Sequence, residues 1–243
     1  MKVIVNADDF GFNASKTDGI AESFRNGWIT QTTLMVNMAD AERAVGIAKQ
    51  LGFADRVGLH FNITEGEPLS EEMRRSHFVG AGGQFNLCTN VNFRHLSVSE
   101  RQALQAEARA QVARFVSFGL PLRHCDSHHH IHFKLSVARV LMPVLRDYGF
   151  KTIRRPYNVS LGWGLYGGLR HIRNALFASL RVRYGLGTTC WFGGAERKID
   201  ADSVEYMVHP CLNELNEVVN VVAYGNEICR PMKEEWSRLQ PIR

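Results

Sequence analysis

Four histidines lie within five positions in the stretch CDSHHHIHF, residues 125–133. Imidazole rings bind ions such as Zn, Fe or Ni, and they exchange protons near neutral pH. If this stretch extends a β-strand, alternation puts His129 on one face. The other face then holds His124, Asp126, His128, His130 and His132. A solvated loop is the alternative, but such density beside an aspartate favours a functional site.

A second polar segment, NADDFG at residues 6–11, contains the adjacent pair Asp8 and Asp9. Neighbouring side chains of an extended strand point in different directions, so one carboxylate could bind a metal while the other acts as a base. A polar turn ending at Gly11 explains the same residues equally well. The segment alone therefore leaves both readings open.

Two single histidines end other predicted strands. His60 lies in GLHFNIT and His209 in MVHP. Alone, His60 is more typical of an ordinary hydrogen-bonded residue, and His209 could simply end its strand. His209 could also act as a general acid, because the ordinary pKa of histidine lies near working pH. Four polar strand ends together favour a catalytic site.

The elements that would position these residues follow a repeating pattern of strands and helices. Seven short β-branched runs occur at 2–6, 32–37, 56–63, 121–128, 151–156, 188–192 and 204–209. Segments of helical period occur at 15–26, 39–51, 99–118, 135–148 and about 165–184. This alternation predicts one α/β domain over residues 1–243, a seven-stranded (β/α) barrel that is incomplete or distorted. Active residues of such folds gather at the carboxyl ends of the strands.

Charge and cysteine content limit the classes of partner. The chain has 243 residues and a net charge of +5, but its tightest basic clusters are the pairs Arg74–Arg75 and Arg154–Arg155, which are typical of solvated surface. A looser set, Arg170, Arg173, Arg181 and Arg183, shares a segment with Leu169, Ile172, Leu176 and Leu180 at helical spacing. An outer barrel helix accounts for it, so we expect neither a nucleic-acid nor a membrane partner. Five cysteines without a C-x-x-C motif, and a short apolar start, favour the cytoplasm.

The motifs NADDFG, GLHFNIT, HCDSHHHIH and MVHP, in this order, resemble those of the YdjC-like carbohydrate deacetylases, which include chitooligosaccharide deacetylases and a hopanoid-associated branch. The match runs from Asn6 to Pro210. The resemblance implies a barrel related to polysaccharide deacetylases and one divalent metal ion, Mg or Zn first, with Mn, Co and Ni open. It also implies hydrolysis of N-acetyl groups on an amino sugar or short chitooligosaccharide, with release of acetate.

Roles carried over from the resemblance fall on particular residues. The metal ligands would be Asp9, His60 and His128, the base Asp8 and the acid His209, although the order within the Asp8–Asp9 pair stays open. The position of His129 is free to vary in the family pattern. His130 and His132 in the histidine run are assigned to the substrate pocket or to orienting the ligands. Apart from the resemblance, Arg155 and Asn158 in RRPYN, beyond the fifth strand, are expected to contact substrate.

Two other functions remain open from the residues alone. The same ligands could serve a hydrolase of another bond, such as a phosphoester, or a non-catalytic sugar-binding module. The chain has no G-x-S-x-G, Walker, G-x-G-x-x-G or H-E-x-x-H motif, so no organic cofactor is indicated. A small carbohydrate is the expected partner, and a homodimer is compatible with the sequence.

Overall fold

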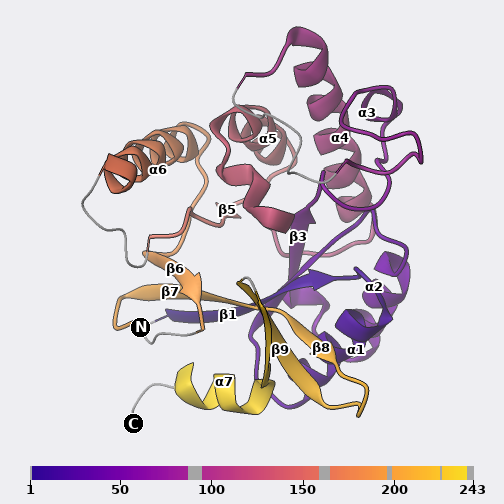
Figure 1. Cartoon of the computed structure of the whole chain (residues 1–243), viewed down its shortest axis with the longest axis vertical. Coiled ribbons are helices and arrows are strands. Elements are labelled where there is room, and N and C mark those ends of the chain that lie inside the picture. The colour runs from indigo at the N-terminus through magenta and orange to yellow at the C-terminus, as the bar shows by residue number, and fades with distance from the viewer. Residues whose placement is uncertain (1, 87–94, 159–164, 196–198, 225, 240–243) are drawn as a thin grey trace.

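Seven parallel strands form a single curled sheet in the computed structural model, which describes residues 2–86, 95–158, 165–195, 199–224 and 226–239 (Figure 1). The strands are β1 (Lys2–Phe10), β2 (Gln31–Leu34), β3 (Val57–Phe61), β4 (His124–Ser127), β5 (Thr152–Ile153), β6 (Trp191–Gly194) and β7 (Ser203–Val208). Their order across the sheet is β5-β4-β3-β2-β1-β7-β6. All seven predicted strands are confirmed.

The two outer strands of this sheet approach each other through the segment that precedes β6. Ile153 N–H donates to the Gly187 carbonyl at 3.0 Å, and Gly187 N–H donates to the Lys151 carbonyl at 2.7 Å. An isolated parallel bridge pairs Thr152 with Gly187. The prediction of an incomplete seven-stranded (β/α) barrel is therefore confirmed, and the seam lies between β5 and β6.

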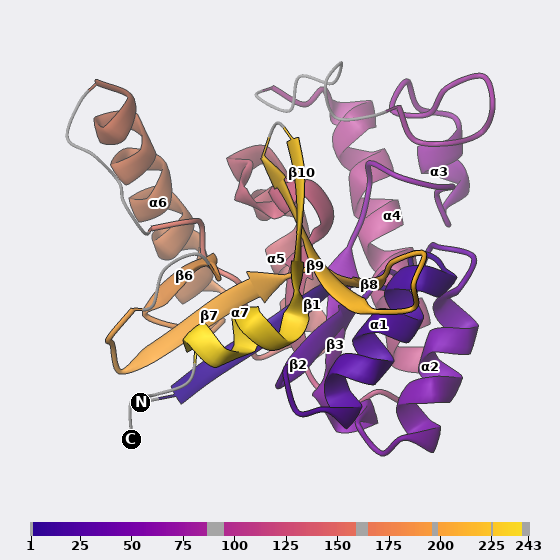
Figure 2. The same cartoon turned by 60° about the horizontal axis from the view of Figure 1, so that its bottom comes forward.

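Helices connect the strands and lie outside the sheet (Figures 1 and 2). The long ones are α1 (Ala14–Arg25), α2 (Ala41–Gln50), α4 (Val98–Ser117), α5 (Leu135–Asp147) and α6 (Leu165–Arg183), each within two residues of its predicted bounds. In α5 the predicted apolar stripe is buried, as Val137, Leu141 and Val144 show. The connection predicted over 64–98 contains the short helix α3 (Glu71–Arg74), while 87–94 lie outside the described residues.

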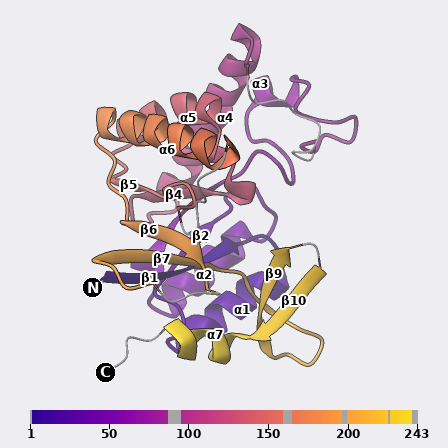
Figure 3. The same ribbon diagram turned by 60° about the vertical axis from the view of Figure 1, so that its left-hand side comes forward.

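The C-terminal part forms a second, antiparallel sheet that the sequence pattern did not predict. It consists of β8 (Pro210–Leu212), β9 (Val218–Tyr224) and β10 (Asn226–Pro231), and α7 (Met232–Leu239) follows it. This sheet lies beside α1 (Figure 3). Ser15 Oγ donates to the Leu212 carbonyl at 2.8 Å. At the closest approach, a Cβ added to Gly19 would lie 2.6 Å from the Cα atom of Cys211.

We predict that Gly19→Ala destabilises the protein, because its methyl group would collide with backbone that cannot rotate away. The expected loss is about 1–3 kcal/mol in the free energy of unfolding, measured by urea denaturation. Gly46→Ala in α2 is the matched control, since nothing lies within 4 Å of its added Cβ. Alanine should raise helix stability there by about 0.5–1 kcal/mol. Equal effects of the two substitutions would contradict the close approach of α1 and β8.

Candidate metal centre and catalytic site

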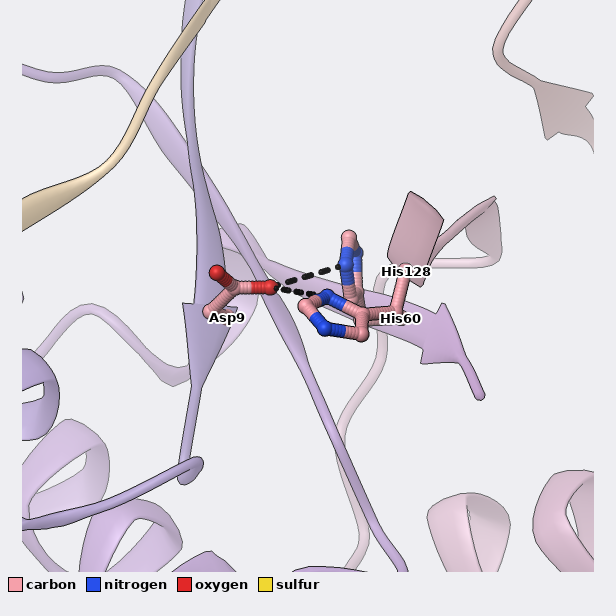
Figure 4. A group of neighbouring side chains, drawn as sticks. All are labelled: Asp9, His60 and His128. Carbon is pink, nitrogen blue, oxygen red and sulfur yellow. Dashed lines mark hydrogen bonds and ion pairs between the residues drawn. The ribbon is translucent and has the colours of Figure 1, made fainter. Parts of the chain in front are cut away.

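The carboxyl ends of β1 and β3, and the turn after β4, bring Asp9, His60 and His128 together. Asp9 Oδ1 lies 2.7 Å from His128 Nδ1 and 3.2 Å from His60 Nε2. Figure 4 shows both rings directed at this one carboxylate oxygen. One ligand atom from each residue lies within 4.8 Å of the others, so the three fit around a single ion. Two histidines and one carboxylate would leave coordination positions open for water and substrate.

The backbone of β1 separates the two adjacent aspartates. The pairing of β1 with β2 shifts register between Ala7 and Phe10, and Asp9 has a left-handed φ of 69°. A left-handed backbone is strained for most residues, although Asp tolerates it better than bulky residues do. As a result Asp9 faces the histidines, whereas Asp8 faces Arg154. This geometry favours Asp9 as the ligand and leaves Asp8 beside the centre.

His60 is oriented by a carboxylate behind it. Its Nδ1 lies 2.7 Å from Asp126 Oδ1, and Thr33 Oγ1 donates to the other oxygen of Asp126 at 3.0 Å. A ring N–H held in this way fixes the tautomer and leaves Nε2 as the ligand atom. Burial alone would lower the pKa of His60, but the charges and hydrogen bonds of Asp126, Asp9 and Asp8 raise that pKa to about 10.

Arg154 lies completely buried at the end of β5, where it pairs with three carboxylates. It donates to both oxygens of Asp8, at 2.6 and 2.7 Å. It also lies 2.8 Å from Asp126 Oδ2, and its Nε donates to Glu205 Oε1 at 2.6 Å. The prediction that the Arg154–Arg155 pair is solvated surface is thus wrong for Arg154. Its N–H donates to the Cys125 carbonyl at 3.0 Å, which continues the ladder of β4 and directs the side chain inward.

These cations control the ionisation of both aspartates. Burial would raise the pKa of Asp8, but the charge and hydrogen bonds of Arg154, with His60 and His209 nearby, outweigh it and lower that pKa below its usual range. Burial opposes ionisation of Asp9 too, yet His128, His60 and Lys16 hold its pKa well below the ordinary value. Lys16 Nζ donates to Asp9 Oδ2 at 2.5 Å. Both groups are therefore carboxylates at neutral pH.

The histidine run does not continue the strand as its alternation predicted. β4 ends at Ser127, and the turn that follows, His128–Phe133, contains His129 and His130 with left-handed φ values of 50° and 52°. Because these two residues depart from the extended backbone of a strand, strand parity does not describe the side chains after His128. The placement of His130 and His132 on the ligand face by parity is therefore wrong.

Each remaining histidine of the run has its own environment. His132 is buried, with Nδ1 2.5 Å from Ser127 Oγ and Nε2 3.1 Å from the Arg154 carbonyl, so it braces the backbone at Arg154. His130 stacks on Phe133 with ring centroids 5.0 Å apart. His129 is exposed, and its Nδ1 lies 3.0 Å from Thr64 Oγ1.

The other predicted site residues lie at the edges of the centre. Arg155 and Asn158 both donate to the Cys190 carbonyl, at the start of β6, and so link the two sides of the seam. The backbone N–H of His209, just after β7, donates to Asn220 Oδ1 at 2.7 Å. Burial lowers the pKa of His209 below the ordinary value, although the charges of Asp9 and Asp8 act in the opposite direction.

The curled parallel sheet, with a carboxylate and two histidines at its carboxyl edge, defines an α/β-barrel protein with a candidate metal centre. The chain belongs to the YdjC-like protein family, whose sequence model matches residues 2–227. The solved structure of an Enterococcus faecalis V583 protein, named as a proposed cellobiose-phosphate cleavage protein, superposes with a TM-score of 0.69. It is 22% identical, and the match covers 98% of this chain and 90% of that one, which supports the fold.

Similar proteins named carbohydrate deacetylase include three from distant organisms. The Brevibacillus brevis protein is 39% identical over 151 residues, which is 61% of this chain and 57% of that protein. The Vibrio vulnificus protein is 40% identical, over 61% and 56% of the two chains. The zebrafish (Danio rerio) protein is 34% identical, over 66% and 51%. The matched region thus spans little more than half the length of these relatives.

We predict that Arg154→Met destabilises the protein by about 3–5 kcal/mol, because it leaves three buried carboxylates without a cation. Arg155→Met is the matched control, since the hydrogen bonds of the Arg155 side chain within the described residues go to the carbonyls of Thr189 and Cys190 and to no carboxylate. Its expected loss is about 1 kcal/mol. Urea unfolding of both variants measures the difference. Similar losses of unfolding free energy in the two variants would show that the buried ion pairs of Arg154 are not what makes this residue important for stability.

The pKa shifts predict a stability maximum near pH 6.5 for the metal-free protein. Burial lowers the pKa of His130 to about 3 and that of His132 well below the ordinary value. Below about pH 6.5 the unfolded chain therefore binds protons that the folded chain refuses, and stability falls with pH by up to about 1.4 kcal/mol per unit per histidine. His60, with a pKa of about 10, keeps a proton that the unfolded chain releases, so stability also falls as pH rises above about 6.5.

Urea unfolding between about pH 5 and pH 9 tests this maximum. His130→Phe should make the acid limb shallower, because it removes one of the histidines whose pKa is lowered by burial. A metal-free protein that gains stability as the pH falls from 6.5 to 5 would contradict the assignment.

Proposed function

We propose that this protein is a metal-dependent hydrolase that removes N-acetyl groups from an amino sugar or short chitooligosaccharide. The observation that carries the proposal is the convergence of Asp9, His60 and His128, with the second carboxylate of Asp8 beside them. The names of the matched relatives support the same chemistry. The proposal places the protein in the cytoplasm, in keeping with its odd number of five widely spaced cysteines.

The charge balance of the centre favours a divalent ion. Four buried carboxylates meet at the barrel interior, those of Asp8, Asp9, Asp126 and Glu205. In the described part of the chain, two permanent cations pair with them, Arg154 and Lys16. Two negative charges remain, which one divalent ion would neutralise. A buried unbalanced charge is costly, so the raised pKa of His60 in the metal-free protein reflects the same deficit.

A divalent ion held by Asp9, His60 and His128 would polarise the acetamide carbonyl and lower the pKa of a water molecule. The donor set is compatible with Zn, and the proposal extends to Mg, Mn, Co and Ni. Asp126 would keep the ring of His60 oriented toward the ion. Lys16, on the free oxygen of Asp9, would hold that carboxylate in one rotamer.

Asp8 would accept a proton from the attacking water. Arg154 keeps it ionised and fixes the plane of its carboxylate, and Asn6 Nδ2 adds a hydrogen bond at 2.8 Å. A low pKa makes Asp8 a weak base, but one that is available at every physiological pH. His209 would then donate a proton to the departing amine. Because its lowered pKa leaves it neutral at rest, it must gain that proton within the site.

A cavity of about 510 Å³ lies beside the histidine run, next in sequence to the proposed ligand His128, and we propose that it receives part of the sugar. Its lining residues are His95, His129, His130, Phe133, Lys134, Leu135, Ser136 and Arg173. We propose that His130 contacts substrate there. His132 has no exposed surface and would act by supporting Arg154. The proposed substrate roles of Arg155 and Asn158 require the seam side of the barrel to contribute to the same pocket.

The second candidate function is hydrolysis of a phosphoester. The cavity lining supports it, because it contains Lys134, Arg173 and three histidines but no carboxylate among the described residues. The discriminating experiment strips the protein of metal and restores one ion at a time. Acetate is then measured from a panel of N-acetylated amino sugars, and phosphate from sugar phosphates. Release of phosphate alone would replace the first function by the second.

We predict that His128→Ala abolishes both metal binding and turnover, since it removes one of three ligands. His129→Ala, the neighbouring residue on the exposed side of the turn, should leave both largely intact. Asp8→Asn should keep the metal and lose turnover. Metal content by mass spectrometry and acetate release measure these outcomes. Equal loss in the two histidine variants would refute the ligand assignment, and full turnover of Asp8→Asn would refute the role of Asp8 as the base. A protein that binds the sugar with or without Asp8 and releases no acetate would instead be a sugar-binding module.

A further inference from the structure

Of the aliphatic stripe predicted to pack α6 against the barrel, Leu180 contacts the core, but Leu169, Ile172 and Leu176 face outward. Leu169, Ile172, Leu176 and Val182 are 57%, 59%, 46% and 67% exposed. In α6 it is Phe177 that is buried instead. The helix lies at the edge of the molecule, on the side away from α2 (Figures 1 and 2). Of the seven large hydrophobic side chains that are exposed in the described residues, these four belong to this one helix.

The same helix lies in the most basic part of the chain. Residues 155–195, which follow the buried Arg154, contain five arginines and no aspartate or glutamate, so their charge equals the net charge of +5 of the whole chain. Among the ion pairs of the described residues, none joins an arginine of α6 to a carboxylate. Partial burial and the like charge of Arg170 lower the pKa of Arg173, which shows cations crowded without counter-ions.

We propose that α6 docks on an anionic lipid membrane surface. Its aliphatic side chains would enter the interface between headgroups and acyl chains, and Arg170 and Arg183 would meet the lipid phosphates. Exposed aliphatic residues combined with arginines and no acidic residue are the composition of helices that lie in this interface. None of the described helices has the length and apolar character needed to cross a bilayer, so the contact is peripheral.

The charges of α6 disfavour the other occupants of this face. A second copy docked through α6 would bring two sets of four arginines into one interface, with no acidic residue on either helix to separate them. A nucleic acid would neutralise the arginines but would leave the aliphatic side chains in water. A membrane with acidic headgroups would both bury the aliphatic side chains of α6 and pair with its arginines. This inference does not depend on the proposed deacetylase chemistry.

Co-sedimentation with lipid vesicles tests the docking. We expect the full chain to bind vesicles of phosphatidylcholine mixed with phosphatidylglycerol, to bind phosphatidylcholine vesicles far less, and to dissociate at high salt. The double variant Ile172→Glu and Leu176→Glu should lower the bound fraction by roughly tenfold or more. Both side chains are exposed, so folding should persist, which circular dichroism checks.

Leu215→Glu is the matched control, because Leu215 is 76% exposed but lies in the turn between β8 and β9. It should bind vesicles as the unmodified protein does. Equal loss in the control, equal binding to neutral vesicles, or absence of binding would overturn the proposal. So would a dimer, seen by light scattering without lipid, that the double variant abolishes, since the occupant would then be a second copy.

Discussion

The interior of this barrel depends on one buried guanidinium. Arg154 joins carboxylates from three strands, Asp8 of β1, Asp126 of β4 and Glu205 of β7, at distances of 2.6 to 2.8 Å. Without it, mutual repulsion and desolvation would raise the pKa of these acids and favour their protonation. With it, Asp8 stays ionised and Asp126 stays able to orient His60. The candidate base and the candidate ligand are therefore positioned by the same cation.

Around this arrangement, the buried carboxylates of the centre outnumber the permanent cations that pair with them in the described part of the chain. One oxygen of Asp9 contacts two histidines and the other contacts Lys16, so cationic or protonatable groups lie on both oxygens of this carboxylate. In the metal-free protein Asp126, together with Asp9 and Asp8, raises the pKa of His60, which then carries a proton on the nitrogen that faces Asp9. An ion must displace that proton to bind, and its apparent affinity therefore increases with pH.

Much of the fold was predictable because hydrophobic alternation reports burial directly. The strands and long helices were found within a few residues, and polar residues at strand ends located the centre. The failures have physical causes. His132 was predicted to share a face with His128 by strand alternation, but the left-handed backbone of His129 and His130 ends the extended conformation on which that alternation depends. Arg154 resembles a surface arginine in sequence, because its three partners come from distant strands. The stripe of α6 has the spacing of a buried face, but spacing cannot tell which side of a helix meets the protein.

The seam of the barrel gives Arg154 a further, mechanical significance. Within the described residues, the backbones on the two sides of the seam pair at one bridge, Thr152 with Gly187, so backbone hydrogen bonding is sparse at this joint. Arg154 comes one residue after β5 and reaches across the interior to β1 and β7. Its ion pairs thereby connect the strand at the seam to strands elsewhere in the barrel. Breathing of the seam, on the timescale of amide exchange, would therefore move Asp8 with it.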